Sequence, residues 1–404
     1  MFNTKNDVIV SRAPGRLDVM GGIADYSGSH VLEFPIAEAT VAAVQLDDER
    51  QLTVVTSLDN EESSFTMPLS VFDGPMEYEA AREFFQEDGE HGWAAYVAGV
   101  FLVLMRERDV RFESGANILI SSQVPLGKGV SSSAALEVAV MQAVAKAFDL
   151  EIEPRDKALL CQKVENLIVG APCGVMDQMT AVFGEANQLL LLLCQPAELI
   201  RRIALPRQLK LWGIDSGIRH SVGGGDYGSV RAATFAGLQI ISELNETKIE
   251  YLANISPGKF EREYVAQLPE HIRIPTAHPI YENVRVQRFV ELLDQPELRF
   301  EELGELMYES HQSYTNLGLN SAGTDLLVEL VRREAPNAGL FGAKITGGGS
   351  GGTVAVLGDQ TSSAAIERVV ASYKKETGHQ PYIFHGSSSG SESFDHLRVS
   401  AANL

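Results

Sequence analysis

The segment Val124–Ala135 constrains the fold of this chain more than any other part of the sequence. It follows a predicted strand over Asn117–Ser122, contains two glycines and three consecutive serines, and leads into strong helix formers over Ala134–Phe148. Backbone amides in such a turn are suited to binding polyphosphate, and the serine hydroxyls can ligate magnesium. It is not a Walker A loop, since glycine follows Lys128. Taken alone, it could equally be a plain helix N-cap.

Three further segments are rich in glycine and charged residues. Ala13–Tyr26 comes directly after a predicted strand over Val8–Arg12, and its arginine and aspartates suit a site that grips hydroxyls and steadies negative charge. The other two are Lys344–Gly352 and a run that begins at Asp215 and includes His220, Ser221, Gly223, Gly224, Asp226 and Tyr227. In isolation, each of the three could be a turn without a catalytic role.

The length of 404 residues predicts two joined domains, because one hydrophobic core rarely organises so long a chain. We expect them to cover residues 1–205 and 206–404 and to be of the α+β class. The Gly/Ser-rich patch Gly386–Ser393 is predicted to be a solvated loop. Helices are predicted over residues 79–86, 93–106, 134–148, 154–168, 229–244, 283–293, 301–315 and 321–333 and from about 175, and strands over 31–46, 189–193, 210–215 and 353–357 and near 343.

The composition excludes some classes of protein. A net charge of −21 argues against a nucleic-acid binder, because binding to phosphate backbones needs a basic surface. No apolar run is long enough to cross a membrane and no leader peptide is recognisable, so we expect a cytoplasmic protein without membrane contact. The cysteines, Cys161, Cys173 and Cys194, have neither disulfide nor metal spacing and are expected to be buried thiols.

The four Gly-rich segments together resemble the galactokinase branch of the family of galactokinase, homoserine, mevalonate and phosphomevalonate kinases, in the family's own order and spacing. The resemblance extends from Ser11 to about Leu357. It is strongest to the kinase portion of L-arabinokinases, whose sequences are similar over Gly15–Gly28, Leu160–Asn166 and Met176–Met179. The additional N-terminal region of some arabinokinases is not recognisable, so a freestanding kinase is expected.

The resemblance implies a ribosomal-protein-S5-like N-terminal domain that carries the phosphate-binding loop, and a ferredoxin-like C-terminal domain. ATP would lie over the loop between them, and Trp93 stands where galactokinases place a tryptophan beside the adenine; it could equally be a core residue. Lys128, which replaces the usual glycine, could touch a phosphate or be an exposed loop residue. The implied nucleotide-binding residues are Trp93, Gly127, Lys128, Gly129, Ser131, Ser132 and Ser133.

The resemblance also implies roles in the reaction. Asp177 matches the catalytic aspartate near the sugar's anomeric hydroxyl, and Arg16 matches the arginine that holds it. Whether Asp177 deprotonates the sugar fully or mainly positions it stays open. Glu165 and Ser133 match the protein ligands of Mg²⁺. The implied sugar-binding residues are Asp25, Gly22, Ile23, Gly174, Asp215 and Tyr227.

Two residues favour L-arabinose over D-galactose as the sugar. Galactokinases have glutamate and histidine at the positions of Gly22 and Ile23, where they reach the exocyclic 6-hydroxyl, and this chain has neither polar group. L-Arabinopyranose is the galactopyranose ring without that hydroxymethyl group. The expected function is therefore an ATP- and Mg²⁺-dependent L-arabinose 1-kinase. The alternatives are a galactokinase, a kinase of another sugar such as a uronic acid, and a non-catalytic sensor of sugar and ATP that regulates an unidentified partner.

Overall fold

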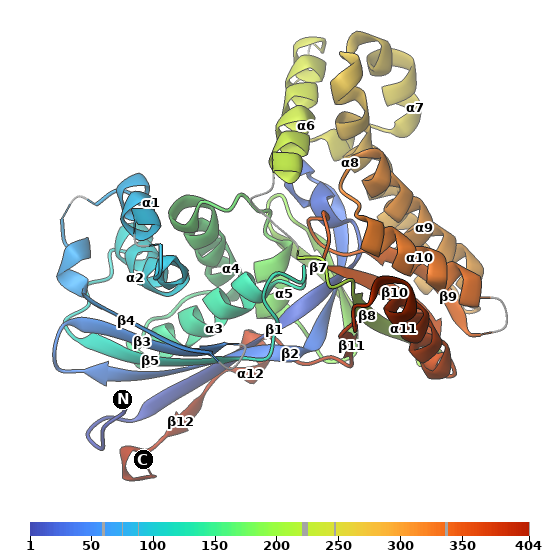
Figure 1. The fold of residues 1–404 in the computed structure, drawn as a ribbon. Helices are drawn as coiled ribbons and strands as arrows, with labels where there is room; N and C mark the ends of the chain where they lie inside the picture. The colour runs from blue at the N-terminus through green and yellow to red at the C-terminus, as the bar shows by residue number, and fades with distance from the viewer. Residues whose placement is uncertain are drawn as a thin grey trace.

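The computed structural model describes residues 1–58, 61–74, 76–87, 89–219, 225–245, 248–335 and 338–403. Its strands form two sheets, helices pack on both, and a helical lobe projects at one end (Figure 1). The α+β class and the two-domain arrangement are therefore confirmed. β7 (Glu198–Ala204) of the first sheet and β8 (Leu209–Asp215) of the second lie on either side of the boundary expected near residue 205, and among the described residues only the last strand, Leu397–Val399, returns to the first sheet after it.

The larger sheet has the strand order β12–β1–β2–β5–β3–β4, and β6 pairs with both β2 and β7. Neighbouring strands are antiparallel except β3 and β5. β2 is central, because residues 40–47 pair with β5 while residues 30–33 pair with β6. The remaining bounds are β1 (Val8–Met20), β2 (His30–Asp47), β3 (Gln51–Leu58), β4 (Glu61–Pro68), β5 (Gly115–Ser122), β6 (Gln188–Leu193) and β12 (Leu397–Val399).

Helices cover one face of this sheet (Figure 1). α3 packs on β1 and β2 and is buried along most of its length, since all residues between its two charged residues, Glu137 and Lys146, are Ala, Val or Met except Gln142. The N–H of Arg16 in β1 donates to the carbonyl of Val130 at 3.1 Å, so the first turn of α3 begins beside Arg16, where the cavity described below is found. The helices are α1 (Tyr78–Glu87), α2 (Ala95–Glu107), α3 (Ser132–Ala147), α4 (Pro154–Lys163) and α5 (Met176–Phe183).

The smaller sheet is antiparallel with the order β11–β8–β10–β9. Apolar residues of β8 and β10 pack against residues of β1, β2 and β6, so one core joins the two sheets. The elements here are β9 (Leu340–Ile345), β10 (Thr353–Asp359), β11 (Ile383–His385), α9 (Phe300–Asn316), α10 (Ala322–Glu334) and α11 (Ser363–Thr377). α10 begins in a capping box between Ser321 and Thr324, close to the predicted start at 321.

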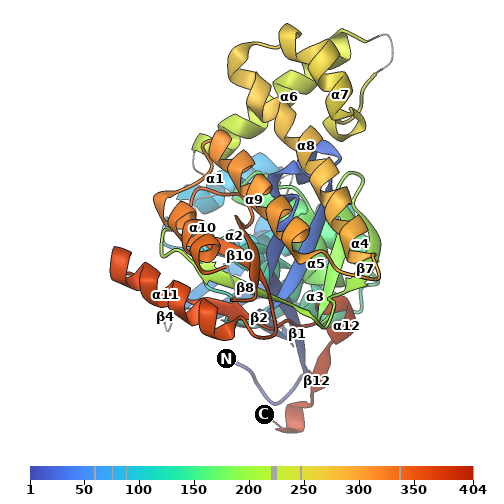
Figure 2. The same ribbon diagram turned by 90° about the vertical axis from the view of Figure 1, so that its right-hand side faces the viewer.

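The projecting lobe is formed by α6 (Gly225–Glu243), the short α7 (Pro257–Lys259) and the first half of α8 (Glu270–Leu293), as Figure 2 shows. It has an apolar core of its own. α8 begins 13 residues before the predicted start at Asn283, because Pro275 and Pro279 argue against a helix but are accommodated inside it. Nowhere in the described residues is a helix both long and apolar enough to span a membrane.

The end of the chain returns to the first sheet. β12 pairs with β1, and α12 (Ser391–Phe394) contacts α5 and β1. The prediction of a solvated loop over Gly386–Ser393 is therefore wrong: Ser391 is fully buried, and the Ser388 hydroxyl donates to the carbonyl of Ile36 at 2.7 Å. Small residues are needed here, since a Cβ at Gly390 would lie 2.4 Å from the carbonyl oxygen of Val182.

Candidate active site

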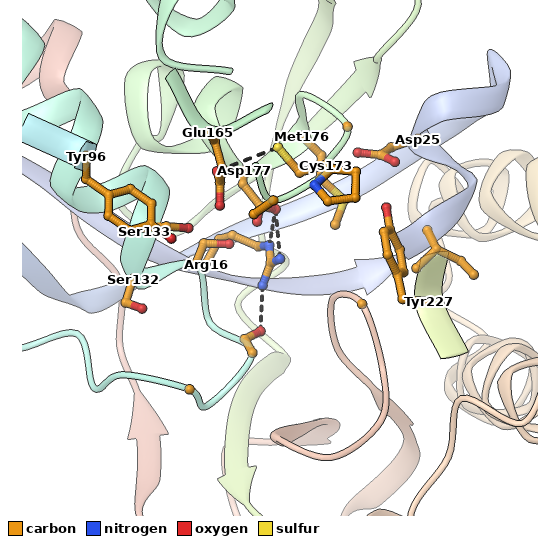
Figure 3. A pocket seen from close by; sticks show the side chains of 18 of the residues that line it. Arg16, Asp25, Tyr96, Ser132, Ser133, Glu165, Cys173, Met176, Asp177 and Tyr227 are labelled. Carbon is orange, nitrogen blue, oxygen red and sulfur yellow. Dashed lines mark hydrogen bonds and ion pairs between the residues drawn. The ribbon is translucent and has the colours of Figure 1, made fainter. Parts of the chain in front are cut away.

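A cavity of about 270 Å³ lies where β1, the turn before α3 and the start of α5 meet (Figure 3). Such a volume is near the lower end for ligand pockets and suits a small polar ligand. The structure brings most of the predicted site residues together at this cavity: Arg16, Ile23, Asp25, Gly127, Gly129, Ser131, Ser132, Ser133, Glu165, Gly174, Asp177 and Tyr227.

Arg16 and Asp177 lie at the centre of the cavity (Figure 3). The Arg16 Nε and Nη2 atoms lie 2.8 and 2.7 Å from Asp177 Oδ1, and Nη1 donates to the carbonyl of Gly129 at 2.7 Å. Behind them the buried Glu33 approaches Arg16 Nε at 3.3 Å. Because one guanidinium contacts both Asp177 and the turn before α3, the carboxylate is held in a fixed position relative to that turn.

The turn before α3 alternates between ordinary and left-handed backbone. Gly127, Gly129 and Ser131 have φ values of 68°, 69° and 61°. Such alternation points successive N–H groups to one side and forms an anion-binding nest at the N-terminus of a 16-residue helix. The Ser131 hydroxyl is buried without a hydrogen-bond partner, so a polar ligand could form a hydrogen bond with it here.

Glu165 reaches the cavity from a π-helical turn, Val164–Val169, that continues α4. The sequence predicts an uninterrupted helix here, whereas the π turn changes the direction in which the side chains after Lys163 point. Burial and the nearby charge of Asp177 raise the pKa of Glu165 to about 7, although hydrogen bonds from Ser133, Cys173 and Gln178 oppose the shift. Burial also raises the pKa of Glu137, the next carboxyl group inward. This end of the cavity therefore gathers buried carboxyl groups whose charged forms burial disfavours.

Asp25 and Tyr227 lie at the opposite end of the cavity from Ser132 and Ser133 (Figure 3). Burial, reinforced by the charge of Asp177, raises the pKa of Asp25 to about 7, although the backbone amide of Met176 donates to it. Gly174 allows this arrangement, because a Cβ there would lie 1.7 Å from Asp25 Oδ2. A polyphosphate on the serine-rich turn and a hydroxyl compound beside Asp25 would thus meet at Asp177.

Four predicted site residues do not line the cavity. Lys128 forms an ion pair of 2.7 Å with Asp215, Gly22 lies behind the wall that Ile23 presents, and Trp93 is half-buried against the core of the first domain. Their roles in binding stay predictions. Within the predicted run from Asp215 to Tyr227, His220, Ser221, Gly223 and Gly224 lie outside the described residues, as does the side chain of Asp226.

The structure also adds residues to the site. Tyr96, within the helix predicted over 93–106, lines the serine-rich end of the cavity, where Ser132 and Ser133 lie (Figure 3). Cys173 was expected to be a buried thiol, as Cys161 and Cys194 are, but it is only partly buried and its Sγ lies 3.6 Å from Glu165 Oε2. The other additions are Leu126, Ala171, Pro172, Met176 and Gly348. Most of them are sequence neighbours of predicted site residues, and this proximity in the sequence was the only signal that could have identified them.

Comparison with protein families gives three matches along the chain. Residues 1–46 match the galactokinase galactose-binding signature, residues 95–185 match the N-terminal domain of GHMP kinases, and residues 289–376 match the C-terminal domain of GHMP kinases. The first two matches include Arg16, Asp25, Glu165 and Asp177.

Individual relatives agree with these matches. The chain is 44% identical to an L-arabinokinase of Arabidopsis thaliana over 99% of its own length, but it spans only 47% of that protein. It is 32% identical to a galactokinase of Haemophilus influenzae (strain PittEE), with 91% of this chain and 89% of the relative covered. Among solved structures, a Lactococcus lactis galactokinase complexed with galactose has the same fold, with a TM-score of 0.82 at 23% identity, covering 95% of this chain and 94% of that one.

Proposed function

Because the chain belongs to the galactokinase branch of the GHMP kinases, whose members are ATP-dependent sugar kinases, we propose that it phosphorylates the anomeric hydroxyl of L-arabinose. The products are L-arabinose 1-phosphate and ADP. The identity of 44% to an L-arabinokinase supports this choice, although the chain spans about half of that relative.

The observation that carries the proposal is the wall beside Asp25. Residues 22–24 are Gly, Ile and Ala, all buried, and Ile23 faces the cavity. A sugar held there by Asp25 finds no side-chain partner on this wall for an exocyclic hydroxyl. Leaving a buried 6-hydroxyl unpaired costs about 1–3 kcal/mol, which corresponds to a roughly 5- to 150-fold preference for the pentose.

The chemistry follows from the placement of Asp177. Its carboxylate accepts a hydrogen bond from the anomeric hydroxyl and takes up the proton as the oxygen attacks the γ-phosphorus of ATP. The bond from that phosphorus to the β,γ-bridging oxygen breaks, and ADP leaves with the electron pair. Arg16 holds Asp177 and offsets charge on the transferring phosphoryl group, while Ser131 and the amides of the turn bind phosphate oxygens.

The residues at the serine-rich end fit Mg²⁺. Ser133 hydrogen-bonds Glu165, whose buried carboxyl group lies near Asp177, and burial together with the charge of Asp177 raises its pKa to about 7. No cluster of three or more His, Cys, Asp or Glu suited to a metal occurs among the described residues. This accords with Mg²⁺, which needs only one or two protein ligands beside phosphate oxygens and water. Glu165 and Ser133 would hold the ion, which neutralises charge on the phosphates when bound.

The proposal is tested by measuring kcat/KM with ATP for L-arabinose and D-galactose. We expect L-arabinose to be preferred at least fivefold, with D-galactose a slow substrate. A preference for D-galactose would identify a galactokinase, which the identity of 32% to galactokinases makes the second candidate. No ADP release with any pentose or hexose, despite binding of ATP, would identify a sensor and contradict the kinase proposal.

A further inference from the structure

We propose that Tyr314 of α9 is a specificity-determining positioning residue. It fills the space that a side chain at position 22 would occupy, and it fixes the turn that carries the wall facing the sugar. This inference rests on the proposed preference for L-arabinose and assigns part of that preference to a residue of the second domain.

The space beside Gly22 is already occupied. Gly22 has a φ of +49°, and a Cβ on it would lie 1.8 Å from the hydroxyl oxygen of Tyr314 and 2.8 Å from Asp18 Oδ2. Non-bonded heavy atoms do not approach so closely. A side chain at position 22, such as the glutamate of galactokinases, therefore requires Tyr314 to move or to be replaced.

Tyr314 is held firmly where it is. Its side chain is fully buried, its hydroxyl donates to the carbonyl of Gly347 at 2.9 Å, and its ring meets the ring of His278 edge-on with centroids 5.5 Å apart. Lys344 Nζ lies 5.4 Å from the ring centroid. Moving the ring would leave a buried hydroxyl and a buried carbonyl without partners, which is costly.

The same hydroxyl anchors the wall itself. The backbone N–H of Ile23 donates to it at 2.9 Å, and the N–H of Gly22 donates to Asp18 Oδ1, also at 2.9 Å. Asp18 is in turn fixed by a fully buried ion pair with Lys344. These bonds fix the start of the 3-10 turn Gly22–Ser27, which carries both Ile23 and Asp25. Tyr314 thus sets how closely the apolar wall approaches the sugar.

The first test is a rescue at position 22. Gly22→Ala should raise the KM for L-arabinose at least fivefold and lower the melting temperature, because the added methyl meets the Tyr314 oxygen. Tyr314→Phe removes that oxygen and should restore part of the loss in the double variant; the rest remains, because the Ile23 N–H loses its acceptor and Asp18 Oδ2 still lies 2.8 Å from the added methyl group. Gly318→Ala is the matched control, since Gly318 also has a left-handed φ (+73°) but open space around it. Absence of rescue overturns the proposal.

The second test measures specificity. Gly22→Glu/Ile23→His should not raise the ratio of kcat/KM for D-galactose to that for L-arabinose while Tyr314 is present. The same pair combined with Tyr314→Leu should raise that ratio at least tenfold. An equal rise in both backgrounds overturns the role of Tyr314 but leaves the proposed function intact. A wild-type preference for D-galactose refutes the proposed function itself, whatever the variants do. If the triple variant does not fold, the rescue at position 22 decides.

Discussion

At the serine-rich end of the cavity, charged and polar side chains form ion pairs and hydrogen bonds with one another. The end that carries Asp25 is bounded mainly by apolar groups. Arg16 contacts Asp177 and Gly129, and the buried Glu165 carboxyl group accepts hydrogen bonds from Ser133, Cys173 and Gln178. At the other end Ile23 and Tyr227 belong to an apolar cluster that also contains Tyr314. The first end has the groups that phosphoryl transfer needs, and in the proposed function the second end selects the sugar because Ile23 offers no polar group to an exocyclic hydroxyl.

This difference separates catalysis from specificity along the cavity. Charged groups that act on the phosphoryl group must be held in position by neighbouring residues. Substitutions at the serine-rich end should therefore lower kcat. The apolar side chains at the other end limit which sugar fits. Substitutions at that end should therefore alter the KM for the sugar and leave the KM for ATP unchanged.

The largest effect is expected from Asp177→Asn. The amide keeps the size of the side chain but cannot take up the proton of the anomeric hydroxyl, so kcat should fall about 10²- to 10⁴-fold. Affinity for ATP, measured by calorimetry, should change less than threefold, and the melting temperature reports on folding. A loss of kcat below tenfold at saturating sugar would mean that Asp177 acts mainly by positioning the sugar.

Gly174→Ala should disrupt sugar binding at the opposite end of the cavity, where Asp25 lies. Its Cβ would lie 1.7 Å from Asp25 Oδ2, so Asp25 must leave its position. We expect a 10- to 100-fold loss of kcat/KM for L-arabinose, mostly in KM, because a displaced sugar-binding group costs this much. Gly74→Ala, at a glycine with open space, is the control. A loss confined to kcat, or a matching rise in the KM for ATP, would contradict the separation of the two ends.

Sequence motifs predicted the serine-rich end far better than the apolar wall. Arg16, Glu165 and Asp177 stand in contiguous segments whose residue types disclose their chemistry, and the structure brings them together. At Gly22 the sequence shows only that no side chain is present, and it does not show which residue fills the space. What occupies its space is Tyr314, 291 residues from its bonding partner Ile23, and no local pattern links the two segments.

The fold, like the site, was predictable where the sequence pattern is regular and not where it depends on local irregularity or close packing. Regular helices and the buried strands follow from periodicity, but the π turn that orients Glu165 is a local irregularity inside a helical pattern. The packing of Gly386–Ser393 against the first domain was not predictable, because a polar composition does not distinguish a solvated loop from one whose small residues allow close backbone contact.

The pH dependence should distinguish the two buried carboxyl groups. Burial raises the pKa of both Glu165 and Asp25 to about 7, so each binds a proton in the folded, ligand-free protein at a pH where the unfolded chain has lost it. Their protonation therefore stabilises the fold below their unfolded pKa values, and this contribution is lost as pH rises through about 7.

Binding should follow the opposite trend, because Mg²⁺ needs the Glu165 carboxylate. Between pH 5.5 and 8.5 the apparent affinity for Mg²⁺ in the presence of ATP should rise up to about tenfold per unit below pH 7 and then level off. Glu165→Gln should weaken and flatten this profile. Asp25→Asn should leave it intact while changing the pH profile of the KM for the sugar. Identical changes in both variants would show that the two ends titrate as one unit.

The smallest effect is expected at Lys128 and Asp215, which lie near the cavity without lining it. Their 2.7 Å ion pair joins the turn before α3 to the end of β8, with Asp215 almost fully buried. Lys128→Met alone leaves that carboxylate unpaired, so it should destabilise the fold more than the double variant with Asp215→Asn does. Urea unfolding of the double-mutant cycle should give a coupling of about 1 kcal/mol.

The exposed pair of Lys5 and Asp48 is the control and should show almost no coupling. If Lys128 serves as a link between the domains, the KM for ATP should change less than about threefold in either single variant, since neither side chain faces the cavity. A tenfold rise in that KM with Lys128→Met, but not with Asp215→Asn, would instead make Lys128 a phosphate ligand. The serine-rich end would then extend beyond the cavity, because Lys128 would have to leave Asp215 when ATP binds.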